Sequence, residues 1–439
     1  MRFSRLTLCY LALCFSPLLA QVVQPPPVAE LAARRAKIFE AIRDGVAVLP
    51  GAQKVAGYVE FRQSNDFWYL TGLEVPDSWL FLDGKSKKAT LLIPQKGYDE
   101  AWVGPYYASI EEVKKQTGID DVRIFSKRKA EDFLRELTSA DRPLYLPNEP
   151  EEVGVTIADS AGPAYKERAA HPWERFKMRE SGIREAFVEA YPKQKFEKLT
   201  GIIRTQRIVK QPSEIDCLRK ASSASARAMI ATIKATKPGR FEYELAAINE
   251  FEGKVLGCQG PSYHPIVGSG PNSCILHYSK KNRRLEDGDM VCCDAASTFS
   301  YYTSDITRSF PANGKFTDEQ RRVYNAVLEA QEACIKETKP GVPLMRLQRL
   351  AVEILKKHDL NKYFIHGLSH HVGMAVHDPS SMGALEVGHV FTIEPGAYLT
   401  KEAIGIRIED VILVTEDGCE VLTKECPKSI EAIEALMAK

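Results

Sequence analysis

The sequence predicts an α/β protein built from more than one domain. Its 439 residues are enough for two or three domains of ordinary size. Short apolar runs bounded by turn residues alternate with segments of helical spacing, a pattern typical of packed layers of helices and strands. Hydrophobic residues make up 44% of the chain, and the formal net charge is +1. A nucleic-acid-binding protein usually carries a basic excess, so we expect no nucleic-acid partner.

The first twenty residues are typical of a secretory signal peptide. Arg2 and Arg5 precede the apolar run LTLCYLALCFSPLLA, and Ala20 offers a small residue for cleavage. The run of about fifteen residues is shorter than the roughly 20 that a membrane-spanning helix needs. We therefore expect export to the periplasm or outside the cell, with no stable membrane span after cleavage. An uncleaved anchor is the alternative. Residues 21–30, QVVQPPPVAE, are a Pro-rich linker.

Residues 31–170 are predicted to form an N-terminal α/β domain. LAARRAKIFEAIRDG, from Leu31, has helical spacing and a glycine stop. Short apolar runs separated by turns then indicate four strands, and a helix follows them. The strand segments are VAVLPG, FWYLTG, SWLFLDG and ATLLIP, and the helix is DFLRELTS. Residues 171–204 are charged and predicted to be a largely helical linker.

Residues 205–439 are predicted to form a second α/β domain. A long helix begins at Pro212 and ends at the sequence PGR. Two further helices are predicted for FEYELAAINEFEGKVLG and DEQRRVYNAVLEAQEACIKET. The strand-like segments are GDMVCCDAAST, SDITRSFPANG, HVFTIEPGAYLT and GIRIEDVILVTEDG. The eight cysteines that follow the signal show no spacing of a zinc knuckle or a disulfide framework, so we expect buried thiols.

Four carboxylates interrupt these apolar strands. Asp294 ends MVCCD, Asp305 begins DITRSF, Glu394 lies in VFTIEPG and Glu409 lies in GIRIED. A hairpin between Asp294 and Asp305 would bring the two side chains together, and strand alternation places Arg407 on the same face as Glu409. Buried carboxylates are unfavourable unless they are paired or bind metal. Two divalent cations would balance four carboxylates and one neutral imidazole.

The imidazole is expected from HGLSHHVGMAVHD, residues 366–378, which holds four of the nine histidines. His366 and His370 have the spacing of the zinc motif HExxH, but Gly367 replaces its glutamate. Upstream, GSG in IVGSGPNSCILHY lacks the third glycine of a dinucleotide-binding loop, and it is better interpreted as a tight turn that leads to His277. Oxygen-rich sites with one imidazole suit Mn²⁺, with Zn²⁺ or Co²⁺ possible.

The carboxylate-bearing and histidine-rich segments described above, and the order in which they follow one another along the chain, resemble those of the pita-bread metallopeptidases. Within that family they resemble the Xaa-Pro aminopeptidases (aminopeptidase P). The resemblance covers residues 205 to 435. It rests on IVGSGPNSCILHY, VCCDAASTFSYYTSDITRSFP, HGLSHHVGMAVHD, TIEPG and GIRIED. FRQSNDFWYLTGLEVP, residues 61–76, also resembles part of the aminopeptidase P N-terminal domain. The resemblance implies a creatinase/aminopeptidase-P-like N-terminal domain, followed by a C-terminal pita-bread catalytic domain.

The resemblance also implies the role of each site residue. The metal ligands would be Asp294, Asp305, His370, Glu394 and Glu409. Glu394 would also be the general base that takes a proton from a metal-bridging water. The resulting hydroxide would attack the scissile carbonyl of the bond before a penultimate proline. His366 and His377 would contact the substrate and stabilise the oxyanion, His277 would line the pocket, and Arg407 would lie beside the metals. His371 would not be a ligand. Homo-oligomers, dimers or tetramers, are expected, with proline-containing peptides as substrates.

Two other functions stay open at this point. Prolidases, which cleave only Xaa-Pro dipeptides, share the catalytic segments and have a related N-terminal domain. The chain could also be a catalytically dead pita-bread binding module, although such modules typically lose ligands and this chain keeps all five. The segment DPSSMGALEVGH after His377 is shorter than is usual in the family, so we expect the leaving-group pocket to differ in shape.

Overall fold

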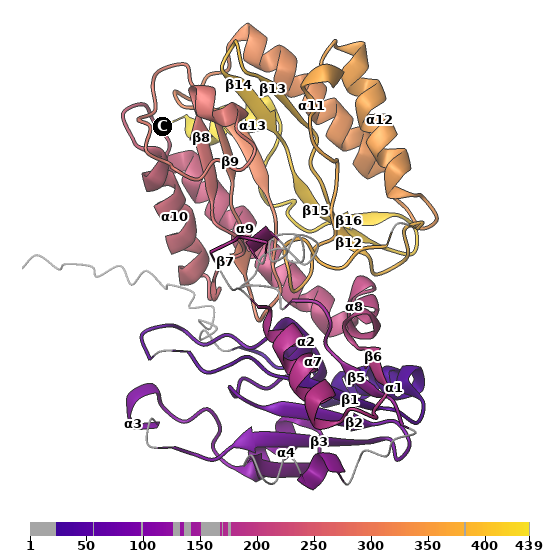
Figure 1. Cartoon of the computed structure of the whole chain (residues 1–439). Coiled ribbons are helices and arrows are strands. Elements are labelled where there is room, and N and C mark those ends of the chain that lie inside the picture. The colour runs from indigo at the N-terminus through magenta and orange to yellow at the C-terminus, as the bar shows by residue number, and fades with distance from the viewer. Residues whose placement is uncertain are drawn as a thin grey trace, which may run out of the picture.

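A computed structural model of the chain describes residues 23–55, 57–97, 100–125, 132–135, 142–150, 167–168, 170–173, 177–381 and 383–438. The predicted signal peptide, residues 1–20, lies outside this part of the chain. Figure 1 shows an N-terminal domain, drawn from indigo to magenta, below a C-terminal domain drawn from pink through orange to yellow. The predicted mixed α/β class is therefore observed in both halves.

The N-terminal domain is built on one mixed six-stranded sheet. The central strands form an antiparallel meander, and the outer strands pair in parallel. The strand order is β4 (Asp121–Phe125), β3 (Lys88–Pro94), β2 (Trp79–Asp83), β1 (Val46–Pro50), β5 (Leu144–Leu146) and β6 (Phe196–Lys198). Its helices are α1 (Val28–Ile42), α2 (Asn65–Thr71), α3 (Glu100–Val103), α4 (Ile110–Thr117) and α7 (Arg179–Ala190).

The prediction of a strand at FWYLTG is wrong, because these residues form helix α2. Six of the seven residues of α2 are buried, so its apolar run has no polar face to reveal a helical period. Gly72 ends the helix with a φ of +62°. The predicted linker over residues 171–204 contains helical structure, as expected, but it also contributes β6 to the edge of the sheet.

The C-terminal domain stacks two pairs of helices on small antiparallel sheets. One pair is α9 (Pro212–Ala235) and α10 (Glu242–Val255), and the other is α11 (Asp318–Glu337) and α12 (Leu344–Lys357). One sheet has the order β11 (Thr307–Pro311), β9 (Met290–Asp294), β8 (Ile266–Ser269), and another has the order β12 (Val390–Ile393), β15 (Asp410–Val414), β16 (Cys419–Val421). Two-stranded sheets join β13 (Gly396–Leu399) to β14 (Ile404–Arg407), and β10 (Ser297–Thr298) to β7 (Gly260–Pro261).

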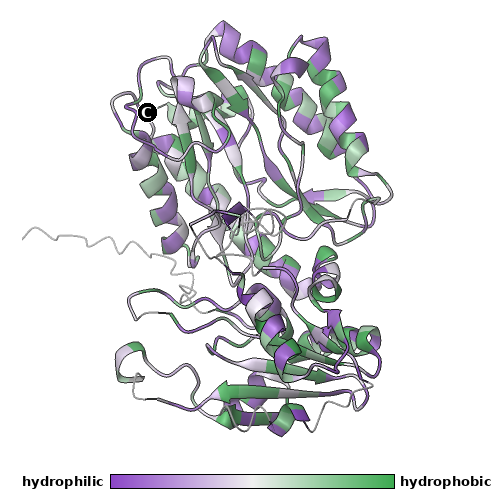
Figure 2. Ribbon diagram, in the orientation of Figure 1, coloured by the Kyte–Doolittle hydropathy of each residue, from purple (hydrophilic) through white to green (hydrophobic). Residues whose placement is uncertain are grey.

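Helices α8 (Thr200–Ile208) and α13 (Ile430–Met437) flank the domain. One 3₁₀ turn, Gly270–Cys274, follows β8, and another, Asn361–Tyr363, follows α12. Apolar residues colour the sheets of both domains green in Figure 2, whereas the outer helices alternate with purple. All eight cysteines after the signal are free thiols, and only Cys419 is less than fully buried. Within the described residues, no helix is both long and apolar enough to span a bilayer.

Candidate metal centre

The two aspartates meet across a strand pair, as the predicted hairpin requires. Asp294 is the last residue of β9 and lies opposite Thr307 of β11, two residues after Asp305. The hydroxyl of Tyr263 contacts both carboxylates, at 2.5 Å from Oδ1 of Asp305 and at hydrogen-bond distance from Oδ1 of Asp294. Both aspartates are buried. The hairpin thus creates one half of an acidic cluster.

The two glutamates come from the second sheet. Glu394 follows β12, and Glu409 precedes β15, which pairs with β12. Thr307 joins this half to the first: its Oγ1 donates to Oε2 of Glu409 at 2.6 Å and accepts from Nε of Arg407 at 3.1 Å. Nη2 of Arg407 also donates to Oδ2 of Asp294 at 2.7 Å. Arg407 and Glu409 therefore contact the same hydroxyl, as expected for neighbours in the site. The single strand predicted over GIRIEDVILV is wrong, however, because β14 (Ile404–Arg407) and β15 (Asp410–Val414) belong to different sheets and Glu409 lies between them.

His370 completes the cluster from the histidine-rich segment. Its Nε2 lies 3.4 Å from Oδ2 of Asp305 and 3.4 Å from Oε1 of Glu394. Ligand atoms of Asp305, His370 and Glu409 all lie within 4.8 Å of one another. All five residues predicted as ligands, although spread over more than a hundred positions of sequence, are therefore gathered in one buried cluster.

The electrostatics of the cluster fit bound cations. Burial and the neighbouring carboxylates raise the pKa of Glu409 well above its ordinary value, and burial is also the main cause that raises the pKa of Glu394 to about 7. Burial alone would lower the pKa of His370, but Asp305 and Glu394 raise it to about 9. Within the described residues, Oε1 of Glu409 is buried without a hydrogen-bond partner. The cluster offers carboxylate oxygens and one imidazole and has too little positive charge to balance its carboxylates, so it suits hard or borderline divalent metals.

Beside the cluster, a chain of hydrogen bonds orients His366. Nη1 of Arg407 donates to the hydroxyl of Tyr398 at 2.8 Å, and that hydroxyl lies 2.9 Å from Nε2 of His366. Nδ1 of His366 lies 2.8 Å from the carbonyl oxygen of Gly367, which can only accept, so we assign the proton to Nδ1. Burial and the charge of Arg407 lower the pKa of His366 to about 4, so the ring is neutral at pH 7.

The other predicted histidines take separate positions. His377 stacks on the ring of His370, with 3.8 Å between ring centroids and an 11° interplanar angle. His277 is exposed, and its charge is close enough to contribute to the lowered pKa of His366. His371 is buried outside the cluster, where its ring faces that of His389 with 5.1 Å between centroids. The structure thus brings His366, His370 and His377 together and separates His371 from the ligands.

The sequence did not indicate three residues that organise this centre. Tyr263 contacts both aspartates, Thr307 links Glu409 to Arg407, and Tyr398 connects Arg407 to His366. Each lies in or beside a strand, in a setting where a tyrosine or threonine is common for packing alone. Their roles follow only from the positions of partners that are distant in sequence.

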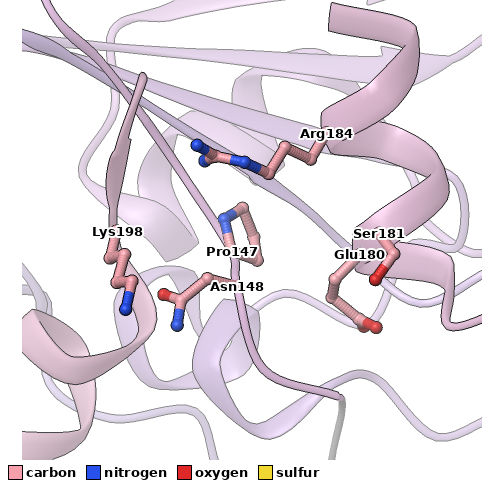
Figure 3. A pocket seen from close by; sticks show the side chains of 6 residues that line it. All are labelled: Pro147, Asn148, Glu180, Ser181, Arg184 and Lys198. Carbon is pink, nitrogen blue, oxygen red and sulfur yellow. The ribbon is translucent and has the colours of Figure 1, made fainter. Parts of the chain in front are cut away.

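A pocket in the N-terminal domain does not belong to this centre. Figure 3 shows that Arg184 and Glu180 of α7 lie on one side of it and Lys198 of β6 on the other, with Pro147 and Asn148 between them. None of its lining residues is a predicted site residue.

Comparisons with known proteins agree with this geometry. The model of metallopeptidase family M24 matches residues 216–416, and that of the aminopeptidase P N-terminal domain matches residues 31–145. The Xaa-Pro aminopeptidase of Escherichia coli is 32% identical over an alignment of 448 positions, gaps included, which covers 93% of this chain and 97% of the relative. The Xaa-Pro dipeptidase of Pyrococcus furiosus is 37% identical over 245 residues, but these are 55% of this chain and 70% of the dipeptidase.

A solved structure shows the same two-domain architecture. Zinc-substituted aminopeptidase P from Escherichia coli, in complex with product, superposes with a TM-score of 0.79 and 29% identity, covering 94% of this chain and 99% of that chain. The predicted N-terminal aminopeptidase-P-like domain and C-terminal pita-bread domain are therefore confirmed. The chain belongs to metallopeptidase family M24, among the members that join its metal-binding domain to an aminopeptidase P N-terminal domain.

Proposed function

We propose that this protein is a dinuclear metallo-aminopeptidase that removes an N-terminal residue from peptides with proline in the second position. The cluster of four carboxylates and His370 carries the proposal, because three of the carboxylates are buried and Glu394 is 15% exposed, and gathering four carboxylates in this way is unfavourable without cations to balance them. The similarity to Xaa-Pro aminopeptidases over nearly the whole chain supports the substrate class.

The residues that would hold the metals are Asp294, Asp305, His370, Glu394 and Glu409. Bound divalent ions would supply Lewis acidity and lower the pKa of a coordinated water. The carboxylate ligands leave Mn²⁺ as the best candidate, with Zn²⁺ and Co²⁺ possible. Metal analysis of the purified protein, with activity measured after each ion is restored to chelated enzyme, would identify the ion that supports turnover.

In the proposed reaction, the chain's own side chains orient the substrate and move one proton. Glu394 accepts a proton from the attacking water and passes it toward the prolyl nitrogen that leaves. Proline's nitrogen carries no hydrogen in the substrate, and its ring fixes φ, so a dedicated pocket is needed for this bond. His377, beside His370, and His366, oriented by Tyr398, would contact the peptide and stabilise the oxyanion. His277 would line the entrance.

The competing function is that of a prolidase. The similarity to a dipeptidase is confined to about half of this chain, whereas the similarity to aminopeptidases includes the N-terminal domain. Hydrolysis of an Xaa-Pro dipeptide and of an Xaa-Pro-Xaa tripeptide should be compared with Mn²⁺ present. We expect the tripeptide to be cleaved between the first residue and proline. Cleavage of the dipeptide alone would establish a prolidase.

Two further properties belong to this proposal. The basic start and short apolar run of residues 1–20 support export to the periplasm or the exterior, and N-terminal sequencing of the exported protein should begin near Gln21. The resemblance to aminopeptidase P supports assembly into a homo-oligomer, a dimer or a tetramer. Light scattering in solution would measure the number of subunits.

A further inference from the structure

Residues 61–76 of the N-terminal domain, FRQSNDFWYLTGLEVP, lie against the loops that carry Asp305 and His370. We call residues 299–305 the aspartate loop and residues 370–378 the histidine loop. The contact is buried: Trp68, Tyr301 and Val372 belong to one hydrophobic cluster that continues across the two domains. This segment includes α2, and none of its residues is a candidate ligand.

Tyr301 of the aspartate loop is held by four residues of this segment. Its ring stacks on that of Trp68, with 4.2 Å between centroids and an interplanar angle of 9°. The guanidinium of Arg62 lies 4.2 Å from the centroid of the same ring. The Tyr301 hydroxyl accepts from the backbone N–H of Gln63 at 2.8 Å and donates to Glu74 at 2.7 Å. The side chain is fully buried, so both of its faces and its polar end are accounted for.

The backbone at this point has a conformation that needs external support. Ser300 and Tyr301 have φ values of +45° and +74°, a region that residues with a Cβ rarely adopt. The N–H of Tyr301 donates to Oε1 of Gln259 at 2.8 Å, and a bridge joins Phe299 to Tyr302. Such backbone strain persists only where the surroundings fix it, and the contacts of Tyr301 supply that restraint.

Further hydrogen bonds restrain the aspartate loop between Tyr301 and the candidate metal ligand Asp305. The N–H and Oγ1 of Thr303 both donate to the carbonyl oxygen of Gly373 in the histidine loop, at 2.8 and 2.9 Å. Ser304, the next residue, donates from its N–H to Oγ of Ser262 at 3.1 Å. Asp305 follows directly. The aspartate loop is therefore tied both to the N-terminal domain and to the histidine loop.

The same segment also contacts the histidine loop itself. Nδ2 of Asn65, the first residue of α2, donates to the carbonyl oxygen of Met374 at 3.3 Å. Met374 lies four positions after His370. Residues 61–76 thus contact both ligand-bearing loops.

We propose that residues 61–76 form a positioning element for the metal centre, in which the Trp68–Tyr301 stack and the hydrogen bonds of the Tyr301 hydroxyl to Gln63 and Glu74 together fix the aspartate loop, so that Asp305 and His370 are preorganised for metal binding. The inference rests on the metal-centre part of the proposed function. It assigns the N-terminal domain a direct effect on metal affinity, beyond any role in substrate binding or assembly. Groups that hold ligands in place typically change metal affinity by 10- to 100-fold when removed.

The test compares metal affinity in two variants of Trp68 and a matched control. Trp68→Leu removes the stack, and Trp68→Phe keeps an aromatic ring against Tyr301. Phe81→Leu is the control, because Phe81 is a buried aromatic of the same domain whose ring packs on Phe133, in a separate cluster away from both loops. Co²⁺ and Mn²⁺ dissociation constants are measured by calorimetry on the full-length protein, without peptide, together with the melting temperature.

Trp68→Leu should raise the metal dissociation constant roughly tenfold or more, and Trp68→Phe should restore it to within about threefold of wild type. Phe81→Leu should lower the melting temperature while leaving the metal dissociation constant unchanged. A Trp68→Leu protein that melts earlier but binds metal with wild-type affinity would overturn the inference, because the stack would then be structural only.

If Trp68→Leu does not fold, Tyr301→Phe decides the question. It keeps the ring stack and removes only the hydroxyl bonds to Gln63 and Glu74, and we expect a dissociation constant raised by about threefold or more. Wild-type affinity in Tyr301→Phe would contradict the inference. Because these measurements contain no peptide, a wild-type protein that binds metal tightly but leaves Xaa-Pro peptides intact would refute the proposed function and not the positioning element.

Discussion

His370 and His371 are neighbours in sequence with opposite environments. Nε2 of His370 lies within 3.4 Å of two candidate ligands, whereas both ring nitrogens of His371 are buried without a hydrogen-bond partner within the described residues. Burial and the charge of Lys210 lower the pKa of His371 to about 3, so the ring is neutral and packs as an apolar group at neutral pH. The environments therefore indicate that His370, and not His371, binds metal.

His370→Ala and His371→Ala form a matched pair that tests this assignment. We expect His370→Ala to lose most of its bound metal, because the only imidazole of the cluster is removed. His371→Ala should keep its metal and lose only packing, about 1–3 kcal/mol of stability. Mass spectrometry measures the metal content of each variant, and urea unfolding measures its loss of stability. Loss of metal in His371→Ala would contradict the ligand set.

His366 should act on turnover and not on metal content. Both of its ring nitrogens are engaged in hydrogen bonds, Nε2 with the hydroxyl of Tyr398 and Nδ1 with the carbonyl oxygen of Gly367, although Nδ1 also lies 3.8 Å from Oε2 of Glu394. His366→Ala should lower kcat roughly a hundredfold with metal content unchanged, as expected for a group that stabilises developing charge. Tyr398→Phe, which keeps the ring and removes the hydrogen bond to His366, should have a smaller effect. Loss of metal in His366→Ala would show that this histidine is a ligand.

At the scale of elements, a buried ion cluster fixes the end of the histidine loop to helix α8. Asp378, next to His377, accepts from Nη2 of Arg207 at 2.6 Å and from Nζ of Lys210 at 3.0 Å. All three side chains are at least 99% buried, and Arg207 also pairs with Asp66 of α2 at 2.9 Å. Burial alone would raise the pKa of Asp378, but Arg207 and Lys210 lower it below its ordinary 3.8.

Asp378→Asn should therefore destabilise the protein in a pH-dependent way. At pH 7 the cost should be about 3 kcal/mol, because Lys210 and Arg207 lose a buried counter-charge. The carboxyl pKa is lower in the folded protein than in the unfolded chain, where it is near 4, so the ionised side chain stabilises the folded state above that pH. This stabilisation is lost as the pH falls through the pKa of the folded state. The difference in the free energy of unfolding between wild type and Asp378→Asn should therefore become smaller below about pH 4.

Urea unfolding between pH 3 and pH 7 measures this difference. Asp121→Asn is the control, since Asp121 pairs with Arg123 at a site where both side chains are 40% exposed or more, and should cost less than about 1 kcal/mol. An equal cost for Asp378→Asn and Asp121→Asn at pH 7 would show that the buried cluster contributes no more than a surface pair.

The elements also show what could be predicted from the sequence. Helices α9, α10 and α11 have caps and an amphipathic period that are readable locally, and their predicted positions were confirmed. Helix α2 was mistaken for a strand because nearly every residue is buried, and α12 was not predicted. The four carboxylates stood out because carboxylates in apolar strands are costly, and the family resemblance assigned them and His370 as the five ligands. Tyr263 and Tyr398 could not be found, because only the tertiary fold brings them to their partners.

At the scale of the whole molecule, metal binding and stability should be coupled. The cluster is buried in the C-terminal domain, and three carboxylates in it have raised pKa values, for which burial is the main cause. Ions that bind the folded state only would stabilise it, by about 2.7 kcal/mol at a free concentration a hundred times the dissociation constant.

Mn²⁺ should therefore raise the melting temperature of the wild-type protein by several degrees over chelated protein. Glu409→Gln removes a ligand and should abolish most of this shift. The chelated variant should be no less stable than chelated wild type, because a buried carboxylate with a raised pKa has been replaced by a neutral amide. Differential scanning calorimetry measures the melting temperature of each protein with chelator and with Mn²⁺. If Mn²⁺ raised the melting temperature of Glu409→Gln as much as that of wild type, the proposed coupling would be wrong.

The central claim is that one buried cluster binds two divalent ions and that these ions are required for cleavage before proline. The direct measurement titrates Mn²⁺ into chelated wild-type protein and into Asp294→Asn, and follows bound metal and hydrolysis of an Xaa-Pro-Xaa tripeptide in the same samples. We expect activity in the wild type to rise with metal and to level off near two ions per chain, while Asp294→Asn loses bound metal and activity together. Full activity in chelated protein, or in Asp294→Asn with two ions bound, would contradict the account.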